Sequence, residues 1–163
     1  MSGPGESRIA PHLRALGTVP SGLFIVTAGV GPTATGTLVS FVQQVGFVPP
    51  AITVALKEGR HVLDLLRDGG RFCISVIDDA SVGLLRHFAR GFEPGEPAFA
   101  DQNVGHDAAG VPYLVDALAW LSCRVIGEVA WSDHVLVCGE VLAGERRDDD
   151  RPMVHVRKSG AGY

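Results

Sequence analysis

The chain has 163 residues, of which 46% are hydrophobic and 20% are charged, and its formal net charge is -4. This composition is typical of one globular domain whose core needs no disulfide or metal. The negative charge disfavours nucleic acid as the main partner, and no apolar run is long enough to cross a membrane. We expect residues 1–8, which are rich in Gly, Ser and Pro, to be a disordered tail before a single domain at 9–163.

The N-terminal segment has no apolar stretch of the kind found in secretory signals, so we expect a cytoplasmic protein. The three cysteines, Cys73, Cys123 and Cys138, lie in apolar segments and show no C-x-x-C spacing. This pattern favours buried free thiols over disulfides or a metal site.

The predicted elements follow in chain order. Strands are expected at 23–28 (LFIVTA), 37–42 (TLVSFV) and 51–57 (AITVALK). Helical spacing of apolar residues follows at 60–68, where Gly69 and Gly70 end the helix. A strand at 71–77 precedes a short helix at 81–90, with a helix cap expected among Asp78, Asp79 and Ser81. After a long turn-rich segment at 91–112, residues 119–147 predict two strands joined at Trp131–Asp133.

These strands are not regularly separated by helices, which disfavours a doubly wound parallel sheet. Antiparallel strands that close into a small barrel would leave no exposed edge. We therefore expect a mainly β protein, a closed antiparallel β-barrel with a few short helices.

Familiar catalytic motifs are missing from the sequence. GPTATGT at 31–37 is followed by Leu38 and lacks the lysine of a phosphate-binding loop, and neither G-x-G-x-x-G nor G-x-S-x-G occurs. The six histidines have no metal-ligand spacing, so no metal is expected. The neighbouring pairs His106–Asp107 and Asp133–His134 are more typical of structural or solvated residues than of a catalytic pair.

The order of segments is more informative than any single motif. The stretch GTLVSFVQQVGFVPP at 36–50 and the Asp-His pair at 133–134, which Gly-Glu-Val follows at 139–141, are its most specific parts. From Leu13 to Tyr163 the chain resembles the flavin reductase-like proteins, whose fold is the FMN-binding split barrel. The resemblance implies a closed split β-barrel that binds FMN, with FAD possible.

In that family the second strand and the following loop wrap the flavin. The resemblance therefore implies that the backbone of Leu38, Val39 and Ser40 faces the isoalloxazine edge, where N–H and C=O groups match the ring atoms. It also implies that Gln44, Val45 and Gly46 cradle the ribityl chain and phosphate. Relatives usually carry Ser or Thr at Gly46, so one hydroxyl donor is missing here. The alternative is that the glutamines belong to a polar edge strand.

Basic residues follow the third strand, where the family places phosphate ligands. The resemblance implies that Lys57, Arg60 and His61 contact the phosphate, and Arg60 is able to clamp it with two hydrogen bonds. The alternative is a solvated helix start. Two cations at a helix N-terminus oppose the helix dipole unless an anion lies there, which favours the phosphate interpretation.

The remaining implied site residues lie near the C-terminus. His134 matches the family's histidine near the flavin face and is expected to donate a hydrogen bond to nicotinamide or flavin; otherwise it is a turn histidine held by Asp133. Arg157, Lys158 and Tyr163 match the family's basic and aromatic end, or form a frayed tail. The resemblance also implies a homodimer with flavin near the subunit boundary.

The resulting hypothesis is an NAD(P)H-dependent flavin reductase in which a nicotinamide passes hydride to bound flavin and the reduced flavin serves an acceptor such as a monooxygenase. Two alternatives stay open at this stage. One is a flavin-binding electron-transfer module without its own nicotinamide site, and the other is a split-barrel scaffold without flavin.

Overall fold

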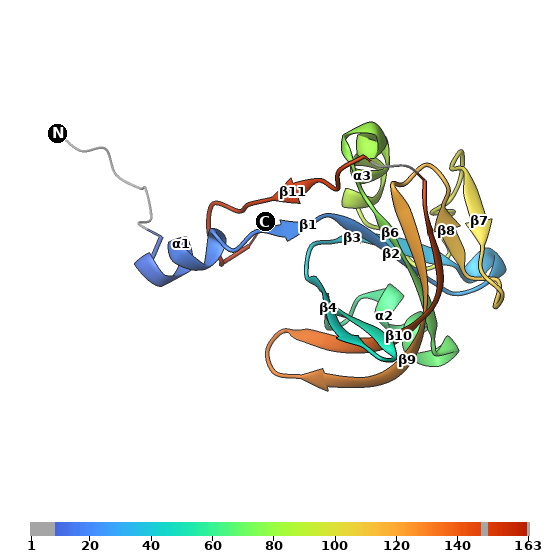
Figure 1. Ribbon diagram of the computed structural model, residues 1–163, viewed down its shortest axis with the longest axis horizontal. Coiled ribbons are helices and arrows are strands. Elements are labelled where there is room, and N and C mark those ends of the chain that lie inside the picture. Colours follow the sequence, from blue (N-terminus) through green and yellow to red (C-terminus); the bar gives the residue numbers. More distant parts are fainter. Residues whose placement is uncertain (1–8, 148–149, 163) are drawn as a thin grey trace.

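The computed structural model describes residues 9–147 and 150–162 (Figure 1). The helices of this part are α1 (Pro11–Gly17), α2 (His61–Gly69) and α3 (Val82–Ala89), with short 3-10 turns η1 (Gly31–Thr33) and η2 (Asp79–Ser81). The strands are β1 (Ser21–Gly22), β2 (Phe24–Ala28), β3 (Thr35–Val39), β4 (Val42–Phe47), β5 (Pro50–Lys57), β6 (Arg71–Val76), β7 (Val104–His106), β8 (Pro112–Leu114), β9 (Ala119–Ala130), β10 (His134–Arg146) and β11 (Val154–His155). The expectation of a mainly β protein with a few short helices is confirmed. The expected tail at 1–8 lies outside the described residues.

Seven strands form the main sheet in the order β3-β2-β6-β9-β10-β5-β4, and every neighbouring pair is antiparallel. The longest hairpin joins β9 to β10 through Trp131–Asp133, as the sequence predicts. Antiparallel pairing brings residues from distant parts of the chain side by side, because each strand runs back along its neighbour. At one end of the β5–β10 ladder, Lys57 lies opposite His134.

The closure of the barrel differs from the expectation. The order of strands has two ends, β3 and β4, so among the described residues backbone hydrogen bonds do not close the sheet. The chain itself connects these two edges through Ser40 and Phe41, at the corner between β3 and β4. The curled sheet visible in Figure 1 is thus bridged covalently, and closure by a hydrogen-bonded ladder is not confirmed.

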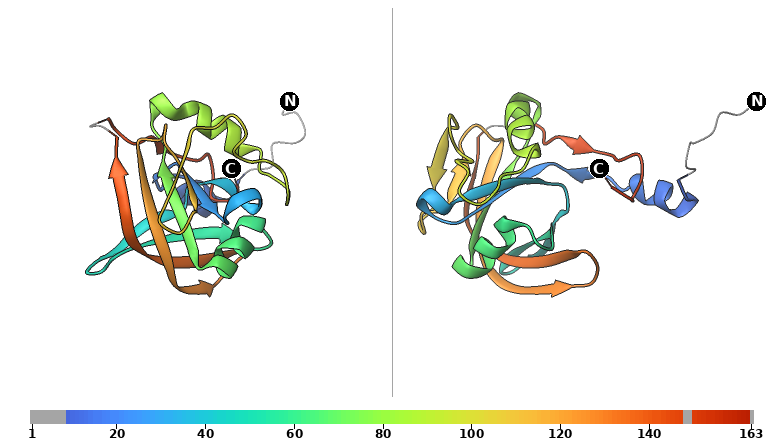
Figure 2. Two further views of the ribbon diagram at one scale, coloured as in Figure 1. Left: turned by 90° about the vertical axis from the view of Figure 1, so that its right-hand side faces the viewer. Right: turned by 180° about the vertical axis from the view of Figure 1, so that it is seen from behind.

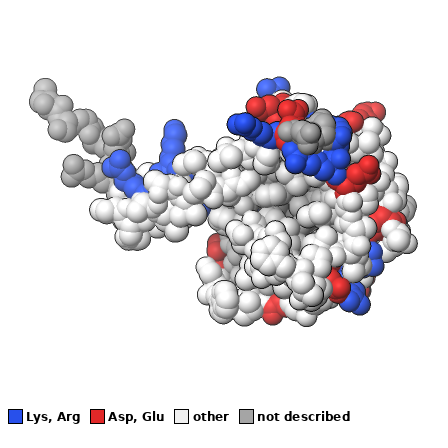
Figure 3. All heavy atoms as spheres, viewed as in Figure 1, with Lys and Arg blue, Asp and Glu red and all other residues white. Residues whose placement is uncertain are grey.

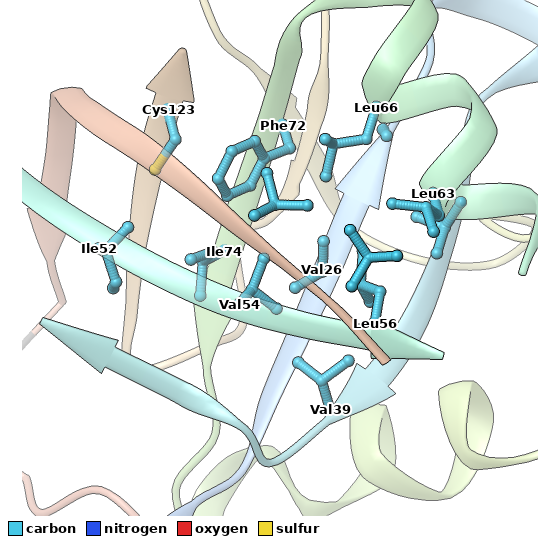
Figure 4. Close-up of a cluster of buried hydrophobic side chains, with 14 residues drawn as sticks. Val26, Val39, Ile52, Val54, Leu56, Leu63, Leu66, Phe72, Ile74 and Cys123 are labelled. Atoms are coloured by element: carbon cyan, nitrogen blue, oxygen red, sulfur yellow. The ribbon is translucent and has the colours of Figure 1, made fainter. Parts of the chain in front are cut away.

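The two faces of the sheet carry separate hydrophobic cores, because side chains alternate between faces along each strand. Val26 and Val54 belong to the core inside the curl, while Ile25, next to Val26, packs on the outer face with Phe88 of α3. Figure 4 shows the inner side chains pointing toward one another from strands and from α2. The inner core consists of Val26, Ala28, Val39, Ile52, Val54, Leu56, Val62, Leu63, Leu66, Phe72, Ile74, Cys123, Val135 and Val137.

Local signals in the sequence explain both longer helices. Val62, Leu63 and Leu66 are the buried face of α2, and Gly70 ends it with a φ of 63° while its N–H donates to the carbonyl of Leu66. Before α3, the Asp78 carboxylate accepts a hydrogen bond from the Ser81 N–H, and the Ser81 hydroxyl accepts one from the Asp78 N–H. The predicted end of α2 is therefore confirmed, whereas the Asp78–Ser81 capping box caps the 3-10 turn η2 that leads into α3, and α3 itself has no side-chain cap.

An arm projects from the barrel and contains both described ends of the chain (Figures 1 and 2). It consists of α1, the β1–β11 pair and residues 157–162, and the sequence did not predict α1. The Arg157 N–H donates to the carbonyl of Gly17, and the Gly160 N–H donates to that of Leu13. Because α1 has only seven residues and buries only Gly17, tertiary contacts hold it rather than an amphipathic pattern.

The long turn-rich segment is held to the sheet by a buried carboxylate. Asp107 accepts hydrogen bonds from Arg71, Ser122 and the N–H groups of Ala109 and Val111, and only 1% of its side chain is exposed. Burial alone would raise the pKa of this carboxyl, but the hydrogen bonds outweigh it and the pKa is lowered. The structural interpretation of Asp107 is thus confirmed.

Two further expectations concern the burial of the cysteines and the presence of membrane-spanning segments. Cys73 and Cys123 are buried free thiols, and burial raises the pKa of Cys123 to about 12, whereas Cys138 is partly exposed. The expectation of buried thiols is therefore confirmed for two of the three. No helix within the described residues has the length and apolar character needed to cross a membrane.

Candidate functional site

A cavity of about 470 Å³ lies between the curled sheet and the C-terminal segment. The ends of β3 and β5, the turn between β9 and β10, and residues 157–162 surround it. Its lining residues are Leu38, Val39, Phe41, Ala55, Leu56, Lys57, Arg60, Ser132, Asp133, His134, Arg157, Gly160, Ala161 and Gly162. The volume is within the range of about 300 to 1,000 Å³ that is usual for small-molecule sites.

The apolar wall of the cavity comes from the corner between β3 and β4. Leu38 and Val39 end β3, and Phe41 follows the buried Ser40. Because β3 is an edge strand, alternate N–H and C=O groups of its backbone point away from β2. This wall therefore combines apolar side chains with backbone groups that are able to bind the polar edge of a flat ring.

Three basic side chains line the cavity. Lys57 ends β5, Arg60 directly precedes α2, and Arg157 enters from the C-terminal segment. The Arg60 side chain makes no helix cap, and its Nη1 lies 3.6 Å from the position that a β-carbon on Gly91 would take. Three positive side chains around one cavity favour an anionic ligand.

His134 lies at the cavity through the pairing of β10 with β5. Its Nδ1 lies 2.7 Å from Oδ1 of Asp133, so the ring N–H donates to the carboxylate and leaves Nε2 for a ligand. This hydrogen bond lowers the pKa of Asp133. The Asp133 carbonyl also accepts the Glu58 N–H, which ties the turn to the end of β5. His134 is therefore both a turn histidine bonded to Asp133 and a lining residue of the cavity.

The structure does not bring all of the expected flavin ligands together. Gln44, Val45 and Gly46 lie on the exposed edge strand β4, where Gly46 is opposite Ala51. Lys57 follows Ala51 by six residue steps along β5, which is about 20 Å along the strand. One phosphate therefore cannot contact both Gly46 and the Lys57–Arg60 group of the same chain.

The other expected residues are distributed as follows. His61 begins α2 beside Arg60 but does not line the cavity, and Lys158 is an exposed neighbour of Arg157. Tyr163 lies outside the described residues. Sequence reasoning missed Phe41 and Gly160–Gly162 as lining residues. Phe41 had one signal, its place in an apolar run that breaks at a polar pair.

The flavin reductase-like domain model matches residues 16–161, which is nearly the whole chain. The chain belongs to the flavin reductase-like family. Its membership agrees with the resemblance recognised in the sequence and with a cavity lined by cations, an apolar wall and exposed strand-edge backbone.

Several known proteins are similar to this family member. The NADH:FAD oxidoreductase of Streptomyces globisporus superposes with a TM-score of 0.81 at 25% identity, over 90% of this chain and 86% of that chain. The styrene monooxygenase flavin reductase of Pseudomonas putida S12 gives a TM-score of 0.74 at 26% identity, over 88% and 90% of the two chains. Diflavin flavoprotein A 1 of Synechocystis sp. is 35% identical over 152 residues, which cover 92% of this chain and 26% of that protein. The chain thus spans about a quarter of this curated relative.

Proposed function

We propose that this protein is an NAD(P)H-dependent flavin reductase that binds FMN in the cavity beside β3. The proposal rests on one observation. The same cavity is lined by an apolar wall, formed by Leu38 and Phe41, and by three cations, Lys57, Arg60 and Arg157. An isoalloxazine ring needs an apolar face and backbone partners, and a phosphate needs cations. Both requirements are met here by residues that line one cavity.

The residues divide the work of binding the flavin. The edge of β3, from Leu38 to Ser40, binds the polar rim of the ring, while Lys57 and Arg60 bind the phosphate. Assignment of Gln44, Val45, Gly46, His61 and Tyr163 to the flavin site stays a prediction. For Gln44–Gly46, that assignment would require a phosphate position separate from Lys57 and Arg60.

His134 lies where it is able to orient the nicotinamide. When bound, the flavin supplies the hydride-accepting chemistry, so the protein has to align two rings rather than provide a strong acid or base. With its Nδ1 bound to Asp133, the His134 ring has a fixed orientation. We infer that its Nε2 contacts the nicotinamide amide or the flavin.

The structural neighbours suggest the choice of co-substrate and partner. One similar protein is named an NADH:FAD oxidoreductase, and another is the flavin reductase of a styrene monooxygenase. By analogy we propose that the reduced flavin made here serves an oxygenase. The preference for FMN over FAD and for NADH or NADPH, and a cytoplasmic location, stay predictions.

Purification followed by flavin extraction and an NAD(P)H oxidation assay tests the proposal. We expect the protein to bind FMN or FAD and to oxidise NADH or NADPH steadily when flavin is added. A protein that binds flavin but does not oxidise either nicotinamide would instead be an electron-transfer module. The similarity to one quarter of a longer diflavin flavoprotein favours that alternative as the second candidate. Failure to bind any flavin would refute both.

A homodimer is part of the proposal. The arm and the hairpin ends expose large apolar side chains, with 84% of Phe47, 97% of Val48, 80% of Trp131 and 70% of Val154 accessible. Figure 3 shows that the face between arm and barrel is mostly uncharged, with charged side chains of both signs along its upper edge. Exposed apolar surface of this kind is typical of an interface. Light scattering at micromolar concentration tests the dimer, and a monomer would contradict it.

A further inference from the structure

Phe41 occupies an unusual place in the barrel. It lies at the corner where β3 ends and β4 begins, and its carbonyl accepts the Ala55 N–H of β5. Its backbone is thus fixed to the barrel, while its ring lines the cavity.

Two candidate site residues contact this ring from different sides of the cavity. The Arg157 guanidinium carbon lies 4.7 Å from the centroid of the Phe41 ring, within the range of a cation–π interaction. The His134 ring packs at 67° to the Phe41 ring, with the two centroids 5.6 Å apart. One aromatic side chain therefore contacts both Arg157 and His134, two residues that line the cavity.

The contact with Arg157 also joins two parts of the molecule. Arg157 belongs to the arm, where its N–H donates to the carbonyl of Gly17, whereas Phe41 belongs to the barrel. Gly160, Ala161 and Gly162, which follow Arg157, line the same cavity. The Arg157 side chain therefore joins this wall of the cavity to the barrel, in addition to the backbone hydrogen bonds that join the segment to α1.

We propose that Phe41 is a positioning residue of the flavin pocket, which acts by holding the Arg157 guanidinium over the cavity and by setting the plane of the His134 ring. This inference rests on the proposed function for its ligand. Phe41 would then link the alignment of the C-terminal segment to that of the nicotinamide site. Loss of its aromatic face should impair both flavin affinity and hydride transfer.

A double-mutant cycle tests the link to Arg157. Phe41→Leu keeps an apolar side chain but removes the aromatic face, and should weaken FMN binding about two- to thirty-fold, the value of a cation–π interaction. In the Arg157→Gln background the same substitution should cost at least about twofold less FMN affinity than in the wild type, because only the direct contact of Phe41 with the flavin is then lost. Phe41→Tyr should retain wild-type affinity. Phe92→Leu is the matched control, because the Phe92 ring has its own cation–π contact, 4.1 Å from Arg90, and does not line the cavity; it should leave FMN affinity unchanged.

A second measurement needs no flavin. Trypsin cleaves after Arg157 and Lys158, and release of the C-terminal peptide reports how often this segment leaves the barrel. Phe41→Leu should release the peptide at least twice as fast as wild type, whereas Phe41→Tyr and Phe92→Leu should not. Melting temperatures of all variants show whether a change in cleavage follows global unfolding.

The outcomes separate the inference from the proposed function. If the wild-type protein binds no flavin, the proposed function fails, and the cleavage rates still decide whether Phe41 holds Arg157. If flavin binds but Phe41→Leu costs the same affinity with and without Arg157, Phe41 does not act through Arg157 and the inference is wrong. Unchanged affinity and unchanged cleavage in Phe41→Leu would overturn it as well.

Discussion

Replacement of Arg60 by Ala should weaken FMN more than riboflavin, because only FMN carries a phosphate. Arg60 directly precedes α2, makes no helix cap with its side chain, and lines the cavity beside Lys57. Removal of the guanidinium should therefore disturb the helix little. Arg67→Ala is a matched control on the same helix, since Arg67 is paired with Glu58 and Glu128 and does not line the cavity.

The size of the effect follows from the exposure of Arg60. A hydrogen bond between charged groups contributes about 1.5 to 3 kcal/mol, and an exposed arginine should be at the lower end of this range. FMN affinity should thus fall about tenfold. Because the screening length shortens from about 10 Å at 0.1 M salt to about 3 Å at 1 M, high salt should reduce the difference between wild type and variant.

Fluorescence titration of FMN and riboflavin against the three proteins, at low and high salt, measures these differences. Riboflavin affinity should be nearly the same for wild type and Arg60→Ala. Equal losses for FMN and riboflavin would refute the assignment of Arg60 to the phosphate. If Arg67→Ala lost as much FMN affinity as Arg60→Ala, the loss would come from the change in the net charge of the protein and not from a contact between Arg60 and the phosphate.

Three further predictions concern His134, Gly46 and Asp107. If the His134 Nε2 contacts the nicotinamide, His134→Ala should lower kcat/KM for NAD(P)H oxidation about 5- to 150-fold and leave flavin affinity in titrations nearly unchanged. An unchanged rate would leave His134 as a turn residue. Gly46→Ser should change the affinity for neither FMN nor riboflavin. A β-carbon at this position would lie 3.4 Å from the Pro49 carbonyl oxygen, which is an ordinary contact, and β4 leads away from the cations that line the cavity. Tighter binding of FMN, with riboflavin unchanged, would mean that the phosphate binds at β4. Asp107→Asn should lower the free energy of unfolding at pH 7 by about 3 to 5 kcal/mol, because Arg71 loses its buried charge partner. The pKa of Asp107 is lowered in the folded state, so its contribution to the free energy of unfolding is complete above the unfolded pKa of about 3.9 and is lost as pH falls through the folded pKa. Urea unfolding should therefore show a smaller difference in the free energy of unfolding between wild type and Asp107→Asn at pH 3 than at pH 7. The same difference at both pH values would contradict this assignment.

Local patterns were sufficient for most elements of the fold. Alternating or continuous apolar residues predicted β2, β5 and β6, and the breaks at Gly69–Gly70 and Trp131–Asp133 were placed correctly. Such signals lie within one or two turns of chain, where backbone conformation and caps are decided by near neighbours. The run at 37–42 was read as one strand, but the chain bends at Ser40 and Phe41 and divides it between β3 and β4.

The sequence by itself was sufficient to predict a mainly β fold and a resemblance to the flavin reductase-like family. That resemblance predicted Lys57, Arg60, His134 and Arg157 as site residues. The tertiary structure alone decided that these four line one cavity and that Gln44–Gly46 lie elsewhere along β4. It also decided that the hydrogen-bonded sheet is open. The physical reason is register: the pairing of Lys57 with His134 across 77 residues depends on how β5 and β10 align along their whole length. No short stretch of sequence carries that alignment, because it is fixed by the packing of both sheet faces together.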